Sequence, residues 1–199
     1  MTRPQKPNFL FIQTDQMTAF ALSHYGNPVV KTPNLDKLAA RGVVFQNAYC
    51  NNPICASSRF SMMSGQLSSR VGAYDNAAEF PAQIPTFAHY LVDRGYHTCL
   101  SGKMHFVGPD QLHGFQERVT TDIYPSDFGW TPDWLAKGHQ LPPSGMSMRS
   151  VVEAGISERS LQIDYDEEAC HQAEVKLWDY ARNSPDQPFF LAVSFTHPH

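Results

Sequence analysis

Cys55 and Arg59 stand four positions apart in this sequence, and their types could support nucleophilic chemistry on an anionic group. The apolar run 43–49 predicts a strand, and the apolar spacing over 55–67 predicts a helix. The free N–H groups and the dipole at a helix start stabilise a thiolate or another anionic nucleophile. Arg59 would share the helix face of Cys55. A buried cysteine beside a solvent-exposed arginine would have the same spacing, so both interpretations stay open.

A lysine and a histidine follow the next predicted strand. The apolar run 96–101 ends at the segment 102–105, which reads Gly-Lys-Met-His. Residues two apart in an extended segment point to the same side, so Lys103 and His105 are expected to converge. Such a pair could neutralise a leaving oxygen and transfer a proton. A solvated lysine beside a loop histidine is the alternative.

An acidic residue follows the first apolar run. The run 9–14 predicts a central parallel strand, and Asp15 and Gln16 come directly after it. Ligands of open α/β sheets bind at the carboxyl ends of the strands, where a carboxylate suits a hard cation such as Ca²⁺ or Mg²⁺. An aspartate that only caps a turn or a helix would occupy the same position.

Predicted strands and helices alternate along the chain. Apolar runs predict strands over 9–14, 43–49, 96–101 and 189–194. Caps and apolar spacing predict helices after Thr32, from Cys55, after Thr86 and over 165–183. Every candidate polar group comes just after a strand, which is the layout of an α/β sandwich with its site at the carboxyl edge of the sheet.

The composition narrows the classes of partner and compartment. The chain has 199 residues, 42% of them hydrophobic, which is ample for one packed core. A formal net charge of -4 without basic runs argues against a nucleic-acid partner. No run approaches the ~20 apolar residues of a membrane span, and no signal-peptide core is visible, so no membrane partner is expected. Free thiols in a reducing, cytoplasmic compartment are the simplest account of the cysteines, Cys50, Cys55, Cys99 and Cys170.

Several segments resemble one family, the type I sulfatases. The segment 55–59, Cys-Ala-Ser-Ser-Arg, resembles their Cys-x-Pro-x-Arg signature, with Ser57 in place of the usual proline. The segments 102–105 and 32–38 are similar to two further stretches of these proteins. The resemblance implies an alkaline-phosphatase-like α/β sandwich, with a central, mostly parallel sheet flanked by helices. It also implies that residues 1–199 are the N-terminal part of a catalytic domain, whose remainder and C-terminal subdomain are absent.

The resemblance implies a modified nucleophile and a metal. In the family, a maturing enzyme oxidises the signature cysteine to formylglycine, so Cys55 would become formylglycine. A divalent cation would bind at Asp15, Gln16 and residue 55. Ca²⁺ is the expected ion, with Mg²⁺ and Mn²⁺ as alternatives.

The resemblance also implies which side chains contact the sulfate group. Arg59, Lys103 and His199 would stabilise the charge on the sulfuryl oxygens, with His197 as a rival to His199. His105 would deprotonate the formylglycine hydrate when sulfate is expelled. The implied reaction is a two-step covalent hydrolysis of a sulfate monoester.

The substrate is suggested by an aromatic segment. The segment 120–134 carries tryptophans beside aspartates, a composition that could hold a quaternary ammonium group or simply pin the loop over the core. Together with 74–80 it resembles the choline-sulfatase branch of the family. The resemblance implies that Trp130 faces the trimethylammonium group, that Asn76 frames the pocket, and that choline-O-sulfate is cleaved to choline and sulfate.

Alternatives stay open at this point. A phosphonate monoesterase or phosphodiesterase, or an arylsulfatase, of the same superfamily would share the motifs. A thiol enzyme that uses unmodified Cys55 with His105 and a non-catalytic binding module are the other two. The complete protein could form a homo-oligomer.

Overall fold

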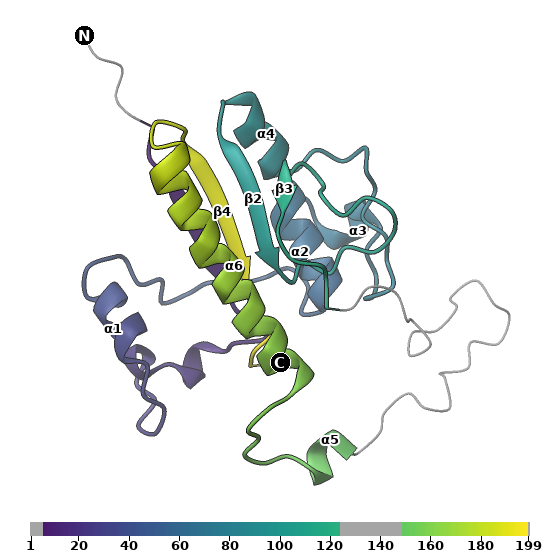
Figure 1. Cartoon of the computed structure of the whole chain (residues 1–199). Coiled ribbons are helices and arrows are strands. Elements are labelled where there is room, and N and C mark those ends of the chain that lie inside the picture. Colours follow the sequence, from purple (N-terminus) through teal and green to yellow (C-terminus); the bar gives the residue numbers. More distant parts are fainter. Residues whose placement is uncertain (1–5, 124–148, 199) are drawn as a thin grey trace, which may run out of the picture.

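The computed structural model describes residues 6–123 and 149–198, which are built around one sheet of four parallel strands (Figure 1). The strand order is β1 (Phe9–Gln13), β4 (Phe189–Ser194), β2 (His97–Gly102) and β3 (Glu117–Arg118). Every neighbouring pair is parallel, so the carboxyl ends of β1, β4 and β2 lie along one edge. The predicted α/β class with a parallel central sheet is confirmed.

The long helix α6 (Leu161–Asn183) covers one face of the sheet and lies across β4 and β2 in Figure 1. It begins earlier than predicted, because the Ser160 side chain caps it by accepting the N–H of Ile163 at 3.1 Å. Ala173 of α6 shares a buried cluster with Leu191 of β4. The predicted helix is confirmed, with an additional first turn.

Two shorter helices cover the opposite face of the sheet. Phe60 of α2 (Cys55–Ser64) and Leu100 of β2 belong to one buried cluster, to which α4 (Phe87–Asp93) also contributes. Strand residues alternate between faces, so this cluster and the one under α6 are separate cores. α2 ends earlier than predicted, because Gly65 follows it in the left-handed conformation at φ 68°. Three layers result, with α2 starting at the carboxyl edge of the sheet.

The remaining described elements are short. They are η1 (Ala19–Ala21), η2 (Ser23–Tyr25), α1 (Pro33–Ala39), α3 (Ser68–Val71) and α5 (Arg149–Val152). Among the helices of residues 6–123 and 149–198, none is long and apolar enough to cross a membrane.

One local prediction, the strand over 43–49, is wrong. The segment 43–49 forms no strand in the described structure, and Val43 and Tyr49 are 80% and 90% exposed. None of the described strands pairs with this segment, so its apolar residues lack the neighbour that a strand needs. Thr32 is the N-cap residue of α1 and Pro33 is its first residue, as predicted, although the Thr32 hydroxyl lies 2.6 Å from the hydroxyl of Ser23 instead of accepting a helix N–H group.

Gly102→Ala is expected to destabilise the fold by more than a left-handed backbone alone explains. Gly102 ends β2 at φ 99°, and an added Cβ would overlap the carbonyl oxygen of Ser194 in β4. Left-handed strain and overpacking together predict a loss of about 2–5 kcal/mol in the free energy of unfolding, measured with urea. The matched control is Gly72→Ala, at φ 80° with no atom near the added Cβ. Equal losses in both variants would contradict the close approach of β2 and β4 at Gly102.

Candidate active site

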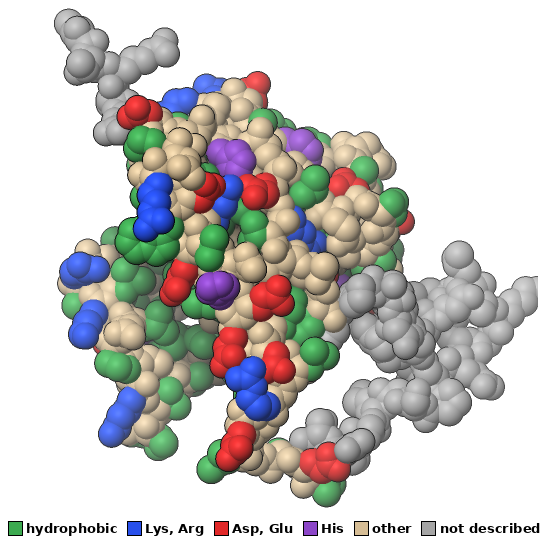
Figure 2. All heavy atoms as spheres, viewed as in Figure 1, with side chains coloured by type: hydrophobic (Ala, Val, Ile, Leu, Met, Phe, Trp, Pro, Cys, Tyr) green, Lys and Arg blue, Asp and Glu red, His purple; other side chains and the backbone are tan. Residues whose placement is uncertain are grey.

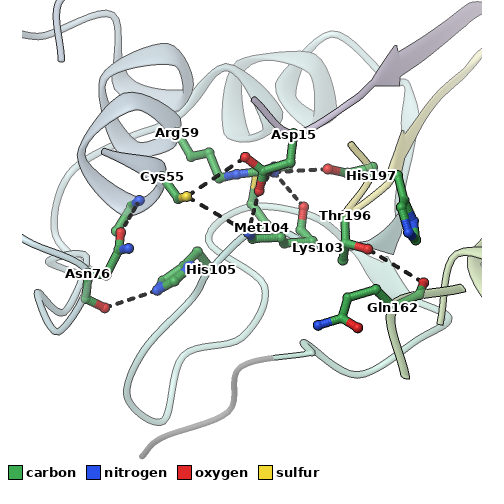
Figure 3. A network of polar contacts seen from close by, with 12 residues as sticks. Asp15, Cys55, Arg59, Asn76, Lys103, Met104, His105, Gln162, Thr196 and His197 are labelled. Atoms are coloured by element: carbon green, nitrogen blue, oxygen red, sulfur yellow. Dashed lines mark hydrogen bonds and ion pairs between the residues drawn. The ribbon is translucent and has the colours of Figure 1, made fainter. Parts of the chain in front are cut away.

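Three side chains from three elements meet at the carboxyl edge of the sheet (Figure 3). Asp15 follows β1, Cys55 is the first residue of α2, and Lys103 follows β2. Sγ of Cys55 lies 3.7 Å from Oδ1 of Asp15 and 3.8 Å from Nζ of Lys103. The Lys103 ammonium also forms an ion pair with Oδ2 of Asp15. The structure therefore brings three of the predicted site residues together around one sulfur atom.

Arg59 lies one turn after Cys55 and is only 2% exposed, so the alternative of a solvent-exposed arginine is wrong. Its Nη1 donates to the carbonyl oxygen of Lys103 at 2.6 Å and to Oγ of Ser194 at 2.9 Å. Its Nη2 lies 3.3 Å from Oδ2 of Asp15. One guanidinium thus ties α2 to the ends of β1, β2 and β4, and it places a second positive charge beside Asp15.

Two asparagines hold the first turn of α2. Oδ1 of Asn52 accepts the N–H of Ile54 at 3.0 Å, and Oδ1 of Asn76 accepts the N–H of Ala56 at 2.9 Å. Both contacts satisfy N–H groups that have no partner within the helix. Cys55 lies between them, at the positive end of the helix dipole. The side chain of Asn76 therefore lies against the helix start, and its contact with a substrate stays a prediction.

His105 approaches the same helix start from the loop after β2. Its Nε2 lies 3.0 Å from the carbonyl oxygen of Asn76; since a carbonyl only accepts, Nε2 carries the proton and Nδ1 the lone pair. Burial lowers the pKa of His105 and the charge of Lys103 lowers it further, against the opposing effect of Asp122. The imidazole is therefore neutral at pH 7, and its Nδ1 can accept a proton.

Asp122 is a residue of this region that the sequence reasoning missed. Its Oδ2 accepts the N–H groups of Met104, His105 and Phe106 at 3.1, 2.7 and 3.3 Å, and it pairs with Nη2 of Arg118 at 2.9 Å. Burial alone would raise the pKa of Asp122, but the charge and hydrogen bond of Arg118 and the N–H donors hold it below its usual range. The residues around Asp122 read as an ordinary loop, so no sequence signal could have found this contact.

The predicted convergence of Lys103 and His105 assumed an extended segment after β2, but this loop is not extended. His105 adopts φ 60°, a left-handed conformation that is uncommon outside glycine. Both side chains nevertheless contact the surroundings of the α2 start, because the loop turns back around the carboxylate of Asp122. The expectation that they converge is confirmed, and its reason is corrected.

A cleft of about 310 Å³ opens at this edge of the sheet, and its walls include Asp15, Gln16, Cys55 and Arg59. Two cations, Arg59 and Lys103, face one carboxylate there. The surplus positive charge, together with the start of α2, favours an anionic ligand.

The predicted metal ligands are only partly grouped. Gln16 lines the cleft next to Asp15 and adopts φ 55°, again left-handed. The pair offers one carboxylate and one amide oxygen, which are donors that hard cations accept. Across residues 6–123 and 149–198, no three side chains of the His, Cys, Asp or Glu type gather as a metal cluster.

His197, near the end of the described residues, does not point toward Cys55. Nδ1 of His197 lies 2.7 Å from Oδ2 of Asp166, and Figure 3 shows the imidazole pointing away from Cys55. The backbone carbonyl of His197 does reach the site, where it accepts the N–H of Asp15 at 3.2 Å. His199 and Trp130 lie outside the described residues.

Known proteins are similar to this chain along nearly all of its length. The family model described as Sulfatase matches residues 7–199. The choline-sulfatase of Rhizobium meliloti (strain 1021) is 49% identical over 197 residues, which are 98% of this chain and 38% of that protein. The arylsulfatase of Clostridium perfringens (strain 13 / Type A) is 31% identical, over 98% of this chain and 44% of that protein. The chain thus spans less than half the length of these relatives.

Solved structures give the same result. A protein in complex with its substrate D-glucosamine-2-N,6-O-disulfate superposes with a TM-score of 0.68 at 26% identity, over 98% of this chain and 35% of that one. The phosphonate monoester hydrolase of Agrobacterium radiobacter has a TM-score of 0.65 at 25% identity, over 98% and 41% of the two chains. Since the family model matches residues 7–199 and the fold agrees, the chain belongs to the sulfatase family.

Proposed function

We propose that the complete protein hydrolyses a sulfate monoester, choline-O-sulfate, to choline and sulfate, and that these 199 residues form the N-terminal part of its catalytic domain. The observation that carries the proposal is the placement of Cys55 at a helix start, with its Sγ 3.7 Å from Asp15 and 3.8 Å from Lys103. The identity of 49% to a choline-sulfatase supports the choice of ester.

The nucleophile in this proposal is made from Cys55. Formylglycine at position 55, once hydrated, would supply one hydroxyl whose oxygen bonds to sulfur while the S–O bond to choline breaks. The second hydroxyl would then lose its proton and re-form the aldehyde as the C–O bond to the transferred sulfate breaks. The start of α2 and the ammonium of Lys103 favour negative charge at this position. Attack followed by release replaces direct attack by water with two covalent steps.

The other site residues would handle charge and protons. The buried Lys103 would hold one sulfuryl oxygen next to position 55, and Arg59, whose Nη2 lies 3.3 Å from Oδ2 of Asp15, would also stabilise the charge on the sulfuryl oxygens. The neutral His105 would take the proton of the second hydroxyl at Nδ1, because its Nε2 is committed to Asn76. His199, outside the described residues, is kept as a further contact to sulfate.

A divalent cation fits one side of the cleft. Asp15 and Gln16 would hold it, since both line the cleft and offer hard oxygen donors. Lys103 and Arg59 already pair with the Asp15 carboxylate and would repel a cation, so these residues alone make a weak site. We propose that further ligands come from parts of the complete protein that this chain does not contain, with Ca²⁺ as the expected ion.

The choice of alcohol would be made by the pocket wall. We keep Trp130 as the aromatic face for the trimethylammonium group and Asn76 at the pocket wall. The phosphonate monoester hydrolase with a similar fold makes phosphonate monoesters the second candidate substrate class. An unmodified thiol enzyme stays the weaker alternative, since the contacts that the structure shows for Sγ are with the carboxylate of Asp15 and the ammonium of Lys103, while Nε2 of His105 donates to the carbonyl of Asn76.

The compartment and the partners stay proposals. All four cysteines are free thiols, which agrees with a reducing compartment such as the cytoplasm. A maturing enzyme that recognises the segment 55–59 is the required protein partner, and a homo-oligomer of the complete protein stays a prediction.

Cys55 is expected to be converted to formylglycine when the complete protein is co-expressed with a maturing enzyme. Peptide mass spectrometry should show an aldehyde at position 55, while Cys50 in the same peptide stays a thiol. Ser57→Pro should leave conversion equal or higher, because proline is tolerated in a first helical turn and the buried Ser57 hydroxyl has no hydrogen-bond partner among the described residues. A free thiol at Cys55 in both variants would contradict the modification.

The 199-residue chain on its own is expected to bind Ca²⁺ and Mg²⁺ only weakly. Ca²⁺ usually takes about six to eight oxygen ligands, whereas Asp15 is the one carboxylate in the cleft. Calorimetric titration should give dissociation constants above the micromolar range, and Asp15→Asn should remove the remaining heat. A submicromolar site in this chain would show that no further ligands are needed.

Trp130→Ala in the complete, matured protein is expected to weaken selection for choline sulfate. A cation over an indole face is worth roughly 0.5–2 kcal/mol, so kcat/KM for choline sulfate should fall by about 2- to 30-fold. A neutral aryl sulfate and a phosphonate monoester serve as comparison substrates, and their kcat/KM should change little. Equal losses on all substrates would mean that Trp130 only holds its loop.

A further inference from the structure

Asp122 lies beneath the loop that carries Lys103 and His105, and the mechanism proposed above does not use it. It is 6% exposed and comes from the segment after β3. One of its oxygens, Oδ2, accepts the N–H groups of three consecutive residues, 104 to 106. Within the described structure, the other oxygen is buried without a hydrogen-bond partner. Burying a carboxylate oxygen without a partner costs free energy, so we expect a role of Asp122 that offsets this cost.

The three N–H groups point to one oxygen because of the backbone at His105. Its φ of 60° turns the chain so that successive N–H groups line a concavity, which is a binding site for an anion. A left-handed histidine persists only where the surroundings compensate the strain. The carboxylate of Asp122 supplies that compensation by accepting the N–H groups of His105 and of its two neighbours, Met104 and Phe106, and it thereby holds the turn that follows Lys103.

Arg118 anchors Asp122 in turn. Its Nη2 contacts Oδ2 of Asp122 at 2.9 Å and the carbonyl oxygen of Gly102 at 3.2 Å. Its Nε donates to the carbonyl of Thr120 at 2.9 Å. The guanidinium therefore joins both ends of the loop, the residue before Lys103 and the segment that carries Asp122. Only 7% of the Arg118 side chain is exposed, so these bonds are shielded from water.

We propose that Asp122 and Arg118 are positioning residues for Lys103 and His105. The ion pair holds the loop after β2 so that the ammonium of Lys103 lies beside Sγ of Cys55 and the imidazole of His105 faces the start of α2. Among the described residues, none of the hydrogen bonds of Asp122 or Arg118 goes to a cleft residue, so both would act through the loop. The part of the proposal that concerns catalysis rests on the proposed sulfatase function.

The four cysteines allow a test that does not depend on activity. Cys55 lies next to Lys103, Cys99 is fully buried in β2, and Cys170 is exposed. In the complete protein, expressed without a maturing enzyme, the alkylation rate of each cysteine by iodoacetamide can be followed by peptide mass spectrometry. The alkylation rate of Cys55 depends on the position of the Lys103 charge. The rate of Cys99 measures global unfolding, and the rate of exposed Cys170 controls for the reactivity of the reagent itself.

Asp122→Asn should slow the alkylation of Cys55 by about fivefold, the factor for two charges about 4 Å apart in water, since the ammonium no longer stabilises negative charge on sulfur. Lys103→Met should give a similar loss and sets the scale. Cys99 and Cys170 should keep their wild-type rates. The matched control is Asp110→Asn, because Asp110 also accepts two backbone N–H groups, of Leu112 and His113, but at another turn.

Arg118→Lys is the milder second variant. It keeps the positive charge but loses the guanidinium, whose several N–H groups join the two ends of the loop. It should slow Cys55 in the same direction. The proposal is overturned if Cys55 reacts at the wild-type rate in both variants, if Cys99 becomes reactive in parallel with any change at Cys55, or if Asp110→Asn has the same effect.

The catalytic consequence is measured separately in the matured protein. Misplacement of Lys103 and His105 should lower kcat for choline sulfate by about 10- to 100-fold in Asp122→Asn, with KM nearly unchanged. A loss confined to KM would overturn the positioning of the reacting groups. A wild-type protein that cleaves no sulfate ester would reject the proposed function, while the alkylation result would still decide whether the ion pair positions Lys103.

Discussion

The arrangement at the carboxyl edge depends on one carboxylate, Asp15, shared by two buried cations. Lys103 and Arg59 both pair with it, and Arg59 also reaches the end of β4. Leaving any of these charges buried without a partner would cost several kcal/mol, about 3–5 when one partner is removed. The strand ends can therefore shift only together. The absence of a side chain at Gly102 lets β2 approach β4 closely enough to keep this cluster intact.

The same cluster defines what the cleft can bind. With two cations, one carboxylate and a neutral His105, the site carries surplus positive charge before any ligand arrives. A monoanionic ester would neutralise it, whereas a free cation would meet repulsion from Lys103. The metal ion proposed to bind at Asp15 would therefore need further oxygen ligands to outweigh that repulsion.

The site residues that could be predicted from the sequence are those that follow the ends of strands. Asp15 and Lys103 directly follow apolar runs, and parallel strands bring such positions to one edge whatever the loops do. Asp122 and the capping role of Asn76 could not be predicted, because each acts on a segment that is distant in sequence and has no periodic signal. The strand predicted over 43–49 is absent from the described structure for a different reason. Its apolar pattern was read correctly, but the pairing partner that a strand requires is not among the described strands.

Under the proposed function, recognition of the sulfate group would be physically separable from recognition of the alcohol. The groups proposed to act on sulfur are fixed by short contacts among β1, β2, β4 and the start of α2, and Asp122 and Asp166 hold the loops after β2 and β4 from outside the cleft. Such a rigid frame tolerates little change. The relatives that match 98% of this chain include a choline-sulfatase and an arylsulfatase. Under the proposed function, a change of alcohol would therefore require changes in the pocket wall and none in the charged cluster.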